Sequence, residues 1–193
     1  MNIFIRLLAV AALCISSAAH ATVIDFDDLD ASNKLSSIGK YNPYDSITWS
    51  NSWYLGPNTY AGYDNGAHSG TQFLLNGFGA NNLSFRSAST FDFVGAWFAV
   101  PNINGSRATW INVSAYDQND ALIGSTGNIG VSNTYAFVEA NFSNASRITV
   151  SRDKGFFIMD DVTLGEPASV PEPGAVALIA LALAGLTVSR RRR

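Results

Sequence analysis

The sequence has 193 residues, enough for one domain and short targeting segments, and its formal net charge is −3. Without the basic residues of the two ends (Arg6 and the run 190–193) and the acid Glu172, seven basic residues remain against 14 acidic ones, a net charge of about −7. This balance argues against nucleic acid as a partner, because phosphate backbones are bound through basic side chains.

Residues 1–21 have the three parts of a secretory signal peptide. Arg6 supplies the positive start, residues 7–15 form a short apolar core, and the A-x-A pattern that ends at Ala21 is a cleavage site. We expect cleavage after Ala21, which removes Cys14, the single cysteine of the chain. The exported protein would then have no disulfide, no thiol catalyst and no cysteine-bound zinc.

Residues 22–165 are predicted to form an exported all-β domain. Stretches of alternating apolar and polar residues recur along it and are separated by Gly, Asn, Asp, Ser and Pro. This pattern of many short strands favours an antiparallel β-sandwich, with a jelly roll as the first choice and an immunoglobulin-like sandwich as the second. The predicted strands are 23–29, 46–55, 71–75, 82–86, 90–100, 108–117, 121–125, 134–142, 146–152 and 156–164.

The stretch TFDFVGAWFAV, residues 90–100, is apolar on both of its predicted faces, which indicates a central strand. Strict alternation places Phe91, Phe93 and Trp97 on one face, and Val94, Phe98 and Val100 on the other. Further along, Gln118-Asn119-Asp120 predicts a turn that joins 108–117 and 121–125 into a hairpin.

Acidic residues mark both ends of the domain. Asp160 falls in the apolar phase of the last strand, where an unpaired carboxylate would cost several kcal/mol. The first strand carries Asp25, Asp27 and Asp28. The terminal strands of a jelly roll commonly lie side by side, so the two acidic groups are expected to meet, and oxygen ligands from two strands would suit Ca²⁺.

The pairing of Asp-Phe-Asp (25–27) with Met-Asp-Asp-Val (159–162) resembles extracellular jelly rolls of the MAM and carbohydrate-binding-module type. The resemblance implies a structural cation held by Asp27 and Asp160, with Asp25 and Asp161 behind them. The alternative is that Asp160 accepts backbone N–H hydrogen bonds and binds no metal.

Residues 49–63 gather aromatic side chains in a stretch rich in Gly, Asn and Ser. Sugar rings stack on exposed aromatic faces, so these residues are candidates for a glycan-binding surface. The alternative is that they fill the core, because large aromatic side chains dominate burial in a small sandwich. The candidates are Trp49, Trp53, Tyr54, Tyr60 and Tyr63.

No catalytic residues are predicted. His68 is the only histidine left after processing, and it is expected on a surface loop. Its neighbour Ser69 lacks the Gly-x-Ser-x-Gly setting of a hydrolase nucleophile. A glycosidase needs two carboxyl groups about 5–10 Å apart. The acids of the terminal strands could meet this distance, so glycoside hydrolysis is a remote alternative.

The last segment, residues 166–193, has three ordered parts. Prolines flank an acid at 170–173, a hydrophobic helix is predicted over 174–189, and four arginines end the chain. A helix over 174–188 would span roughly 22 Å, short of a bilayer core of about 30 Å. The arginines should stay cytoplasmic, which leaves the proline strip outside the membrane and open to a protease. The motif is Val170, Pro171, Glu172 and Pro173, and the basic stop is Arg190, Arg191, Arg192 and Arg193.

This tail resembles the PEP-CTERM sorting signal. The resemblance implies processing by an exosortase and a Gram-negative host that makes exopolysaccharide. We therefore expect an inner-membrane-anchored precursor, then a non-enzymatic protein of the cell surface or extracellular matrix, associated with exopolysaccharide or biofilm. The alternatives are a glycan-binding, lectin-like module and a secreted glycoside-acting enzyme.

Overall fold

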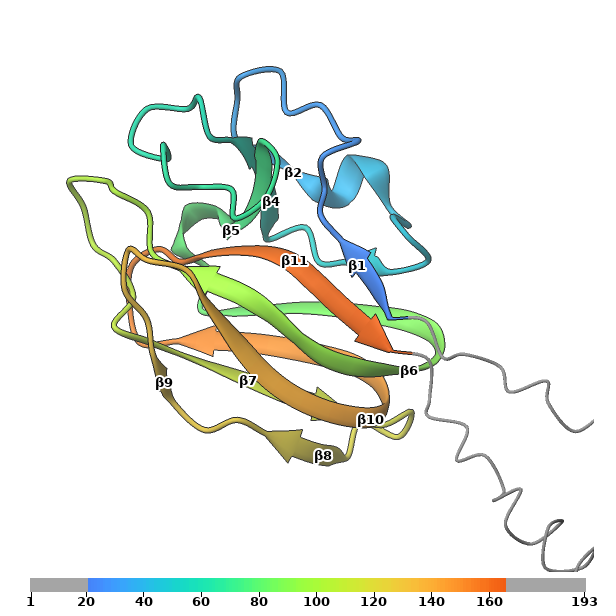
Figure 1. Cartoon of the computed structure of the whole chain (residues 1–193). Coiled ribbons are helices and arrows are strands. Elements are labelled where there is room, and N and C mark those ends of the chain that lie inside the picture. Colours follow the sequence, from blue (N-terminus) through green and yellow to red (C-terminus); the bar gives the residue numbers. More distant parts are fainter. Residues whose placement is uncertain (1–20, 166–193) are drawn as a thin grey trace, which may run out of the picture. The chain divides into compact units, whose positions relative to one another are not determined.

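Antiparallel strands build the part of the chain that the computed structural model describes, residues 21–165 (Figure 1). The signal-peptide and tail predictions fall on residues 1–20 and 166–193 and lie outside the described residues. Within 21–165, no helix is long and apolar enough to cross a membrane. The strands are β1 (Thr22–Ile24), β2 (Ser36–Ser37), β3 (Thr48–Trp49), β4 (Trp53–Pro57), β5 (Gln72–Asn76), β6 (Asn82–Ala99), β7 (Trp110–Tyr116), β8 (Leu122–Ser125), β9 (Ile129–Gly130), β10 (Ala136–Arg152) and β11 (Ile158–Gly165), with short 3₁₀ turns η2 (Ile38–Tyr41) and η3 (Gly77–Gly79).

The prediction of an all-β antiparallel fold is confirmed. The main path of the sheet runs β2-β4-β5-β11-β6-β10-β7-β8, with β1 beside β11, β3 beside β6 and β9 beside β7. The predicted strands 82–86 and 90–100 are one continuous strand, β6, and 134–142 and 146–152 are both parts of β10. The predicted hairpin of β7 and β8 forms, with Asp120 in a left-handed turn conformation.

Strands β6 and β10 bend and so take part in both layers (Figure 1). They pair along most of their length, with register shifts between Glu139 and Arg147. Asn141 and Asn144 adopt positive φ there, as bulges allow. The second half of β6 pairs with β11 and its first half pairs with β3. The bend therefore folds one sheet path into two layers around an apolar core.

The predicted faces of residues 90–100 are wrong in part, because the strand contains bulges. Phe93 and Phe98 both belong to the core, although strict alternation put them on opposite faces. The register between β11 and β6 slips twice and returns to its start, because Asp160 pairs with Trp97, Thr163 with Gly95 and Leu164 with Phe93. Each slip moves the following side chains to the other face, so Trp97 lies on the outer face, away from Phe98.

The terminal strands lie side by side, as predicted, with Ile24 of β1 opposite Val162 of β11. The predicted strand 23–29 is shorter than expected and ends at Ile24. The acids that follow lie in a turn, beside Phe26 with a φ of 64°. Their side chains therefore meet the loop before β5.

Candidate functional site

The loop between β4 and β5, residues 58–71, packs on the outer face of β11 and β6 and defines the candidate site. Its contact point is Asp160, which is 0% exposed. Asp160 Oδ2 accepts hydrogen bonds from the backbone N–H of His68 (2.7 Å) and Ser69 (3.1 Å), and Oδ1 accepts one from the N–H of Asp161 (2.8 Å). A buried carboxyl group on the strand thus anchors the loop.

Asp161 holds the side chains of the same two loop residues. Its Oδ2 lies 2.6 Å from Nδ1 of His68, and its Oδ1 accepts a hydrogen bond of 2.6 Å from the Ser69 hydroxyl. Asp161 reaches both because it sits at a bulge with a φ of 46°. Strict alternation would have turned it away from the side of Asp160.

Four rings gather above these acids, and we call them the ring platform: His68, Trp97, Tyr135 and Phe137. The His68 imidazole stacks on Trp97, with ring centroids 3.9 Å apart and planes 14° apart. Tyr135 meets the imidazole edge-on at 5.4 Å, and its hydroxyl donates to the carbonyl of Gly66. Phe137 meets Trp97 at 5.6 Å and is 37% exposed. The platform therefore presents aromatic surface that the loop holds in place.

Burial shapes the electrostatics beneath the platform. Loss of solvation raises the pKa of Asp160 to about 8, and the nearby Asp161 adds to the rise, while the three N–H donors oppose it. Burial also raises the pKa of Tyr135 well above its usual value, and the two acids add to that rise. Tyr135 therefore stays a neutral hydrogen-bond donor.

The acids that follow β1 hold the other end of the same loop segment. Asp27 Oδ1 accepts hydrogen bonds from the N–H of Thr71 (2.6 Å) and Gln72 (3.0 Å), and Asp25 accepts one from the N–H of Asp27 (3.2 Å). Between the two anchors, Gly70 has a φ of 50°, and a Cβ there would overlap the Asp27 carboxylate. The two acidic groups do converge, but on the backbone of residues 68–72.

This donor set does not fit the predicted calcium site. Ca²⁺ needs six to eight oxygen ligands, whereas N–H groups occupy both oxygens of Asp160 and one of Asp27. Within residues 21–165, no three His, Cys, Asp or Glu side chains are grouped to hold a metal ion. Calcium binding by Asp25, Asp27, Asp160 and Asp161 stays a prediction of the sequence. A thermal melt in EDTA followed by added Ca²⁺ tests it, and an unmoved midpoint removes it.

The predicted glycan surface of 49–63 is wrong for three of its five aromatic residues. Trp49, Trp53 and Tyr63 are 1%, 0% and 5% exposed and lie in the core, so no sugar reaches their faces. Tyr54 is partly buried against Phe78, and only Tyr60 is exposed, at 38%. The alternative, that these aromatic residues fill the core, is confirmed for Trp49 and Trp53, because both occupy buried positions.

Sequence reasoning also missed the partners of His68, which it placed on a plain surface loop. The histidine side chain is 30% exposed and paired with Asp161. The sequence signal that could have found these partners is the pair of acids in an otherwise apolar strand, because buried carboxyl groups need hydrogen-bond partners. Ser69 and His68 both bind Asp161 and do not form the Ser–His contact of a catalytic triad.

Comparison with known proteins adds a match at the C-terminus. Residues 169–193 match the PEP-CTERM protein-sorting motif. No curated protein matches the sequence. Among solved structures, the chain is similar to TmCBM61 in complex with beta-1,4-galactotriose (18% identity, TM-score 0.40, covering 66% of this chain and 91% of that one). It is also similar to the CBM22-1 xylan-binding domain of Paenibacillus barcinonensis Xyn10C (9%, 0.46, 79% and 97%) and to a DUF4465 family protein from Bacteroides caccae (13%, 0.45, 78% and 87%).

Proposed function

We propose, from the PEP-CTERM protein-sorting motif at 169–193, that this chain is a non-enzymatic exported protein of the cell envelope that associates with extracellular polysaccharide. An exosortase would process its tail, and the mature protein would reach the cell surface or the extracellular matrix. The motif is the observation that carries this proposal. The signal peptide expected over 1–21 supports it, because both ends then place the domain outside the cytoplasmic membrane.

Intact-mass analysis of the protein from its native host tests the sorting. We expect a mature species that starts after Ala21 and lacks the arginines 190–193, and a longer species in a host without the exosortase. A mature protein that keeps Arg193 and stays in the membrane fraction would contradict the proposal. A mass above that of the trimmed polypeptide would reveal an attached glycan.

The ring platform supports binding of polysaccharide, as a lectin-like module would bind it. Aromatic rings give large contact area at low cost in conformational entropy, and an exposed apolar patch with a polar edge often marks a binding site. Phe137 supplies exposed ring surface next to Trp97, while Asp161 and Tyr135 fix the rings around them. We place sugar stacking on the exposed ring of Phe137, beside Trp97, rather than on the aromatics of 49–63.

Retention on polysaccharide prepared from the host tests the platform. Phe137→Ala should lower retention about tenfold, because one stacking contact is worth about 1 kcal/mol or slightly more. Phe78→Ala is the matched control, since Phe78 is 91% exposed and is not part of the platform. Retention that Phe137→Ala leaves unchanged, or that Phe78→Ala lowers equally, would remove the platform from the proposal.

A further inference from the structure

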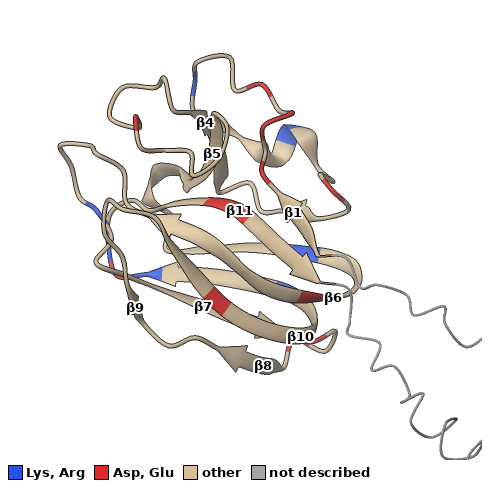
Figure 2. Cartoon of the chain, viewed as in Figure 1, with Lys and Arg blue, Asp and Glu red and all other residues tan. Residues whose placement is uncertain are grey.

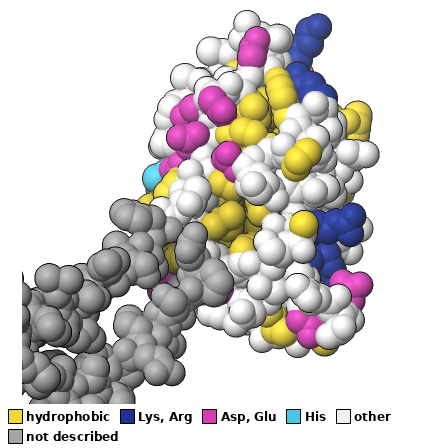
Figure 3. Space-filling view, turned by 90° about the vertical axis from the view of Figure 1, so that its right-hand side faces the viewer, with side chains coloured by type: hydrophobic (Ala, Val, Ile, Leu, Met, Phe, Trp, Pro, Cys, Tyr) yellow, Lys and Arg dark blue, Asp and Glu magenta, His cyan; other side chains and the backbone are white. Residues whose placement is uncertain are grey.

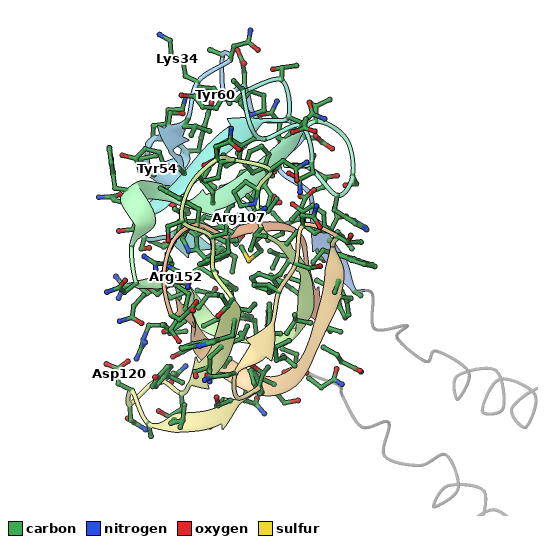
Figure 4. All side chains as sticks on the ribbon, turned by 90° about the vertical axis from the view of Figure 1, so that its left-hand side faces the viewer. Lys34, Tyr54, Tyr60, Arg107, Asp120 and Arg152 are labelled. Carbon is green, nitrogen blue, oxygen red and sulfur yellow. The ribbon has the colours of Figure 1, made fainter. Side chains whose placement is uncertain are left out.

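Loops at one end of the sandwich border an open hollow of about 620 Å³. It lies between the β6–β7 loop, the β9–β10 connection and the turn before β11, and Figure 4 shows Arg107 near the middle of this end of the domain. Its volume falls in the range of roughly 300–1,000 Å³ that is usual for small-ligand sites. Besides three apolar residues, the lining is glycine, basic or polar: Gly105, Ser106, Arg107, Thr109, Ser132, Asn133 and Lys154.

Two cations line this hollow although the domain is acidic. Arg107 and Lys154 are exposed, and within the described residues neither forms an ion pair. Many acidic positions lie near β1 and β11, whereas basic positions are spread over several elements, this end included (Figure 2). Figure 3 shows the opposite end of the domain, where acidic side chains lie on one side of the face and both acidic and basic ones lie along the other edge. Over the part of the chain that the structure describes, the lining of the hollow thus contains two cations and no acid.

The acid closest in sequence, Asp153, offsets only one of these two positive charges. Asp153 accepts hydrogen bonds from the backbone N–H of Thr109 (2.9 Å) and from its hydroxyl (2.6 Å), one on each carboxylate oxygen. These bonds tie Asp153 to the start of β7. A hydrogen-bonded carboxylate keeps its charge, so Arg107 and Lys154 together outweigh Asp153 by one positive charge.

Backbone hydrogen bonds fix the wall that carries Arg107. The N–H of Ala108 donates to the carbonyl of Phe156 (3.0 Å), and the N–H of Phe156 donates to the carbonyl of Ser106 (3.0 Å). Gly155, with a φ of 63°, lets the two segments approach, since a Cβ there would overlap the backbone of Ser106. The arginine therefore projects from a braced segment, which lowers the entropy lost on binding.

An amide network fixes the opposite wall. The Asn65 side chain donates to the carbonyls of Val100 (3.0 Å) and Asn133 (2.9 Å), and its oxygen accepts from the N–H of Asn102 (3.1 Å). Val100 and Asn133 both line the hollow. Three separate loops thus keep one shape.

We propose that this hollow binds a carboxylate-bearing sugar of an acidic polysaccharide, with Arg107 and Lys154 holding the carboxylate. The proposal rests on the proposed function and names its ligand class. The planar guanidinium matches a carboxylate through two parallel hydrogen bonds, and the lysine adds a point charge. Ser106, Ser132 and Asn133 offer donors and acceptors to the sugar hydroxyls.

Calorimetric titration of the purified full-length protein with an oligogalacturonate and with its carboxyl-reduced, neutral counterpart tests this proposal. We expect the acidic oligomer to bind at least tenfold more tightly. Arg107→Ala should weaken that binding by about ten- to a hundredfold, the usual range for a hydrogen-bonded charge. Arg107→Lys should fall between, because it keeps the charge and loses the fork. Lys34→Ala, a charge-matched control on a distant loop (Figure 4), should change nothing.

Each other outcome is decisive. Equal binding of the two oligomers, or binding of the acidic one that Arg107→Ala leaves unchanged, overturns the carboxylate site and leaves polysaccharide binding in place. An equal loss in Lys34→Ala overturns it too, because the attraction is then unspecific. If the wild type binds neither oligomer and also does not bind polysaccharide from the host, the polysaccharide association in the proposed function is overturned as well. Matched thermal midpoints establish that each variant is folded.

Discussion

The packing of the 58–71 loop depends on the carboxyl group of Asp160. It accepts the N–H groups of His68 and Ser69 from the loop and that of Asp161 from its own strand. The N–H of Asp161 is buried and those of His68 and Ser69 are partly buried, so water replaces a lost acceptor poorly and the acid is needed although its burial is costly.

Replacing Asp160 by alanine should lower the free energy of unfolding by about 2–4 kcal/mol, because buried N–H groups lose their acceptor. Denaturant unfolding followed by tryptophan fluorescence measures the change. Asp64→Ala serves as control, since Asp64 is exposed and should change stability by less than about 0.5 kcal/mol. A loss in Asp160→Ala no larger than the control's would show that the loop is held in another way.

Stability should fall as the pH rises from about 4 to 8. Burial raises the pKa of Asp160 to about 8, well above the value of about 3.9 in an unfolded chain. The folded state therefore binds the proton more tightly, its extra stability is complete below pH 4, and it is lost at a slope of at most about 1.4 kcal/mol per pH unit. Urea unfolding at several pH values, in EDTA so that no cation competes, should show this slope in the wild type. Asp160→Asn should flatten it, and equal slopes would contradict the assignment.

The sequence could identify Asp160 as unusual but not its partners. An acid among Ile158, Val162 and Leu164 is visible in the alternation, whereas His68 lies far along the chain in a loop without periodicity. Trp49 and Trp53 were predicted to be exposed because they lie in a polar, Gly-rich stretch, whereas their rings are buried in the core. Tertiary contacts decide both cases, and no local pattern records them.

At the scale of elements, the alternation of apolar and polar residues predicted the strands but not the bulges. Nearly every predicted strand exists, but β6 and β10 are each continuous where two were predicted. The bulge at Asp161 reverses the face of every side chain before it, including Asp160. A single residue with positive φ leaves no mark on hydrophobic periodicity, so the outer face of the sheet could not be predicted.

Gly70→Ala should destabilise the 58–71 loop more than an ordinary glycine substitution. A left-handed alanine costs about 1–2 kcal/mol, and its Cβ would also displace the Asp27 carboxylate. Gly127→Ala is the matched control, because Gly127 has a φ of 70° and nothing within 4 Å of its added Cβ. Thermal melts should show a larger drop for Gly70→Ala, and Asp27→Ala in the same chain should remove the excess. Equal drops in the two glycine variants would mean that the loop tolerates the displacement.

At the scale of the whole molecule, the sorting motif and the two surfaces that we propose to bind polysaccharide belong to separate segments of the chain. Under the two proposals, the motif at 169–193 determines where the protein goes, and the ring platform and the Arg107 hollow bind polysaccharide there. Changes in the tail should therefore alter location and leave binding intact, and changes in the domain should do the reverse.

Pro171→Ala together with Pro173→Ala should block maturation and leave the protein in the membrane fraction. Proline disfavours helix at its own position and at the residue before it, so the sequence predicts an extended strip around Glu172 that the two alanines would no longer favour. Pro167→Ala is the control, because Pro167 precedes the matched motif. Cell fractionation and intact mass report the location, and the double variant, once purified, should bind polysaccharide like the wild type. Normal release of the double variant would mean that the processing enzyme does not read the prolines, and lost binding would mean that the tail and the domain are not independent.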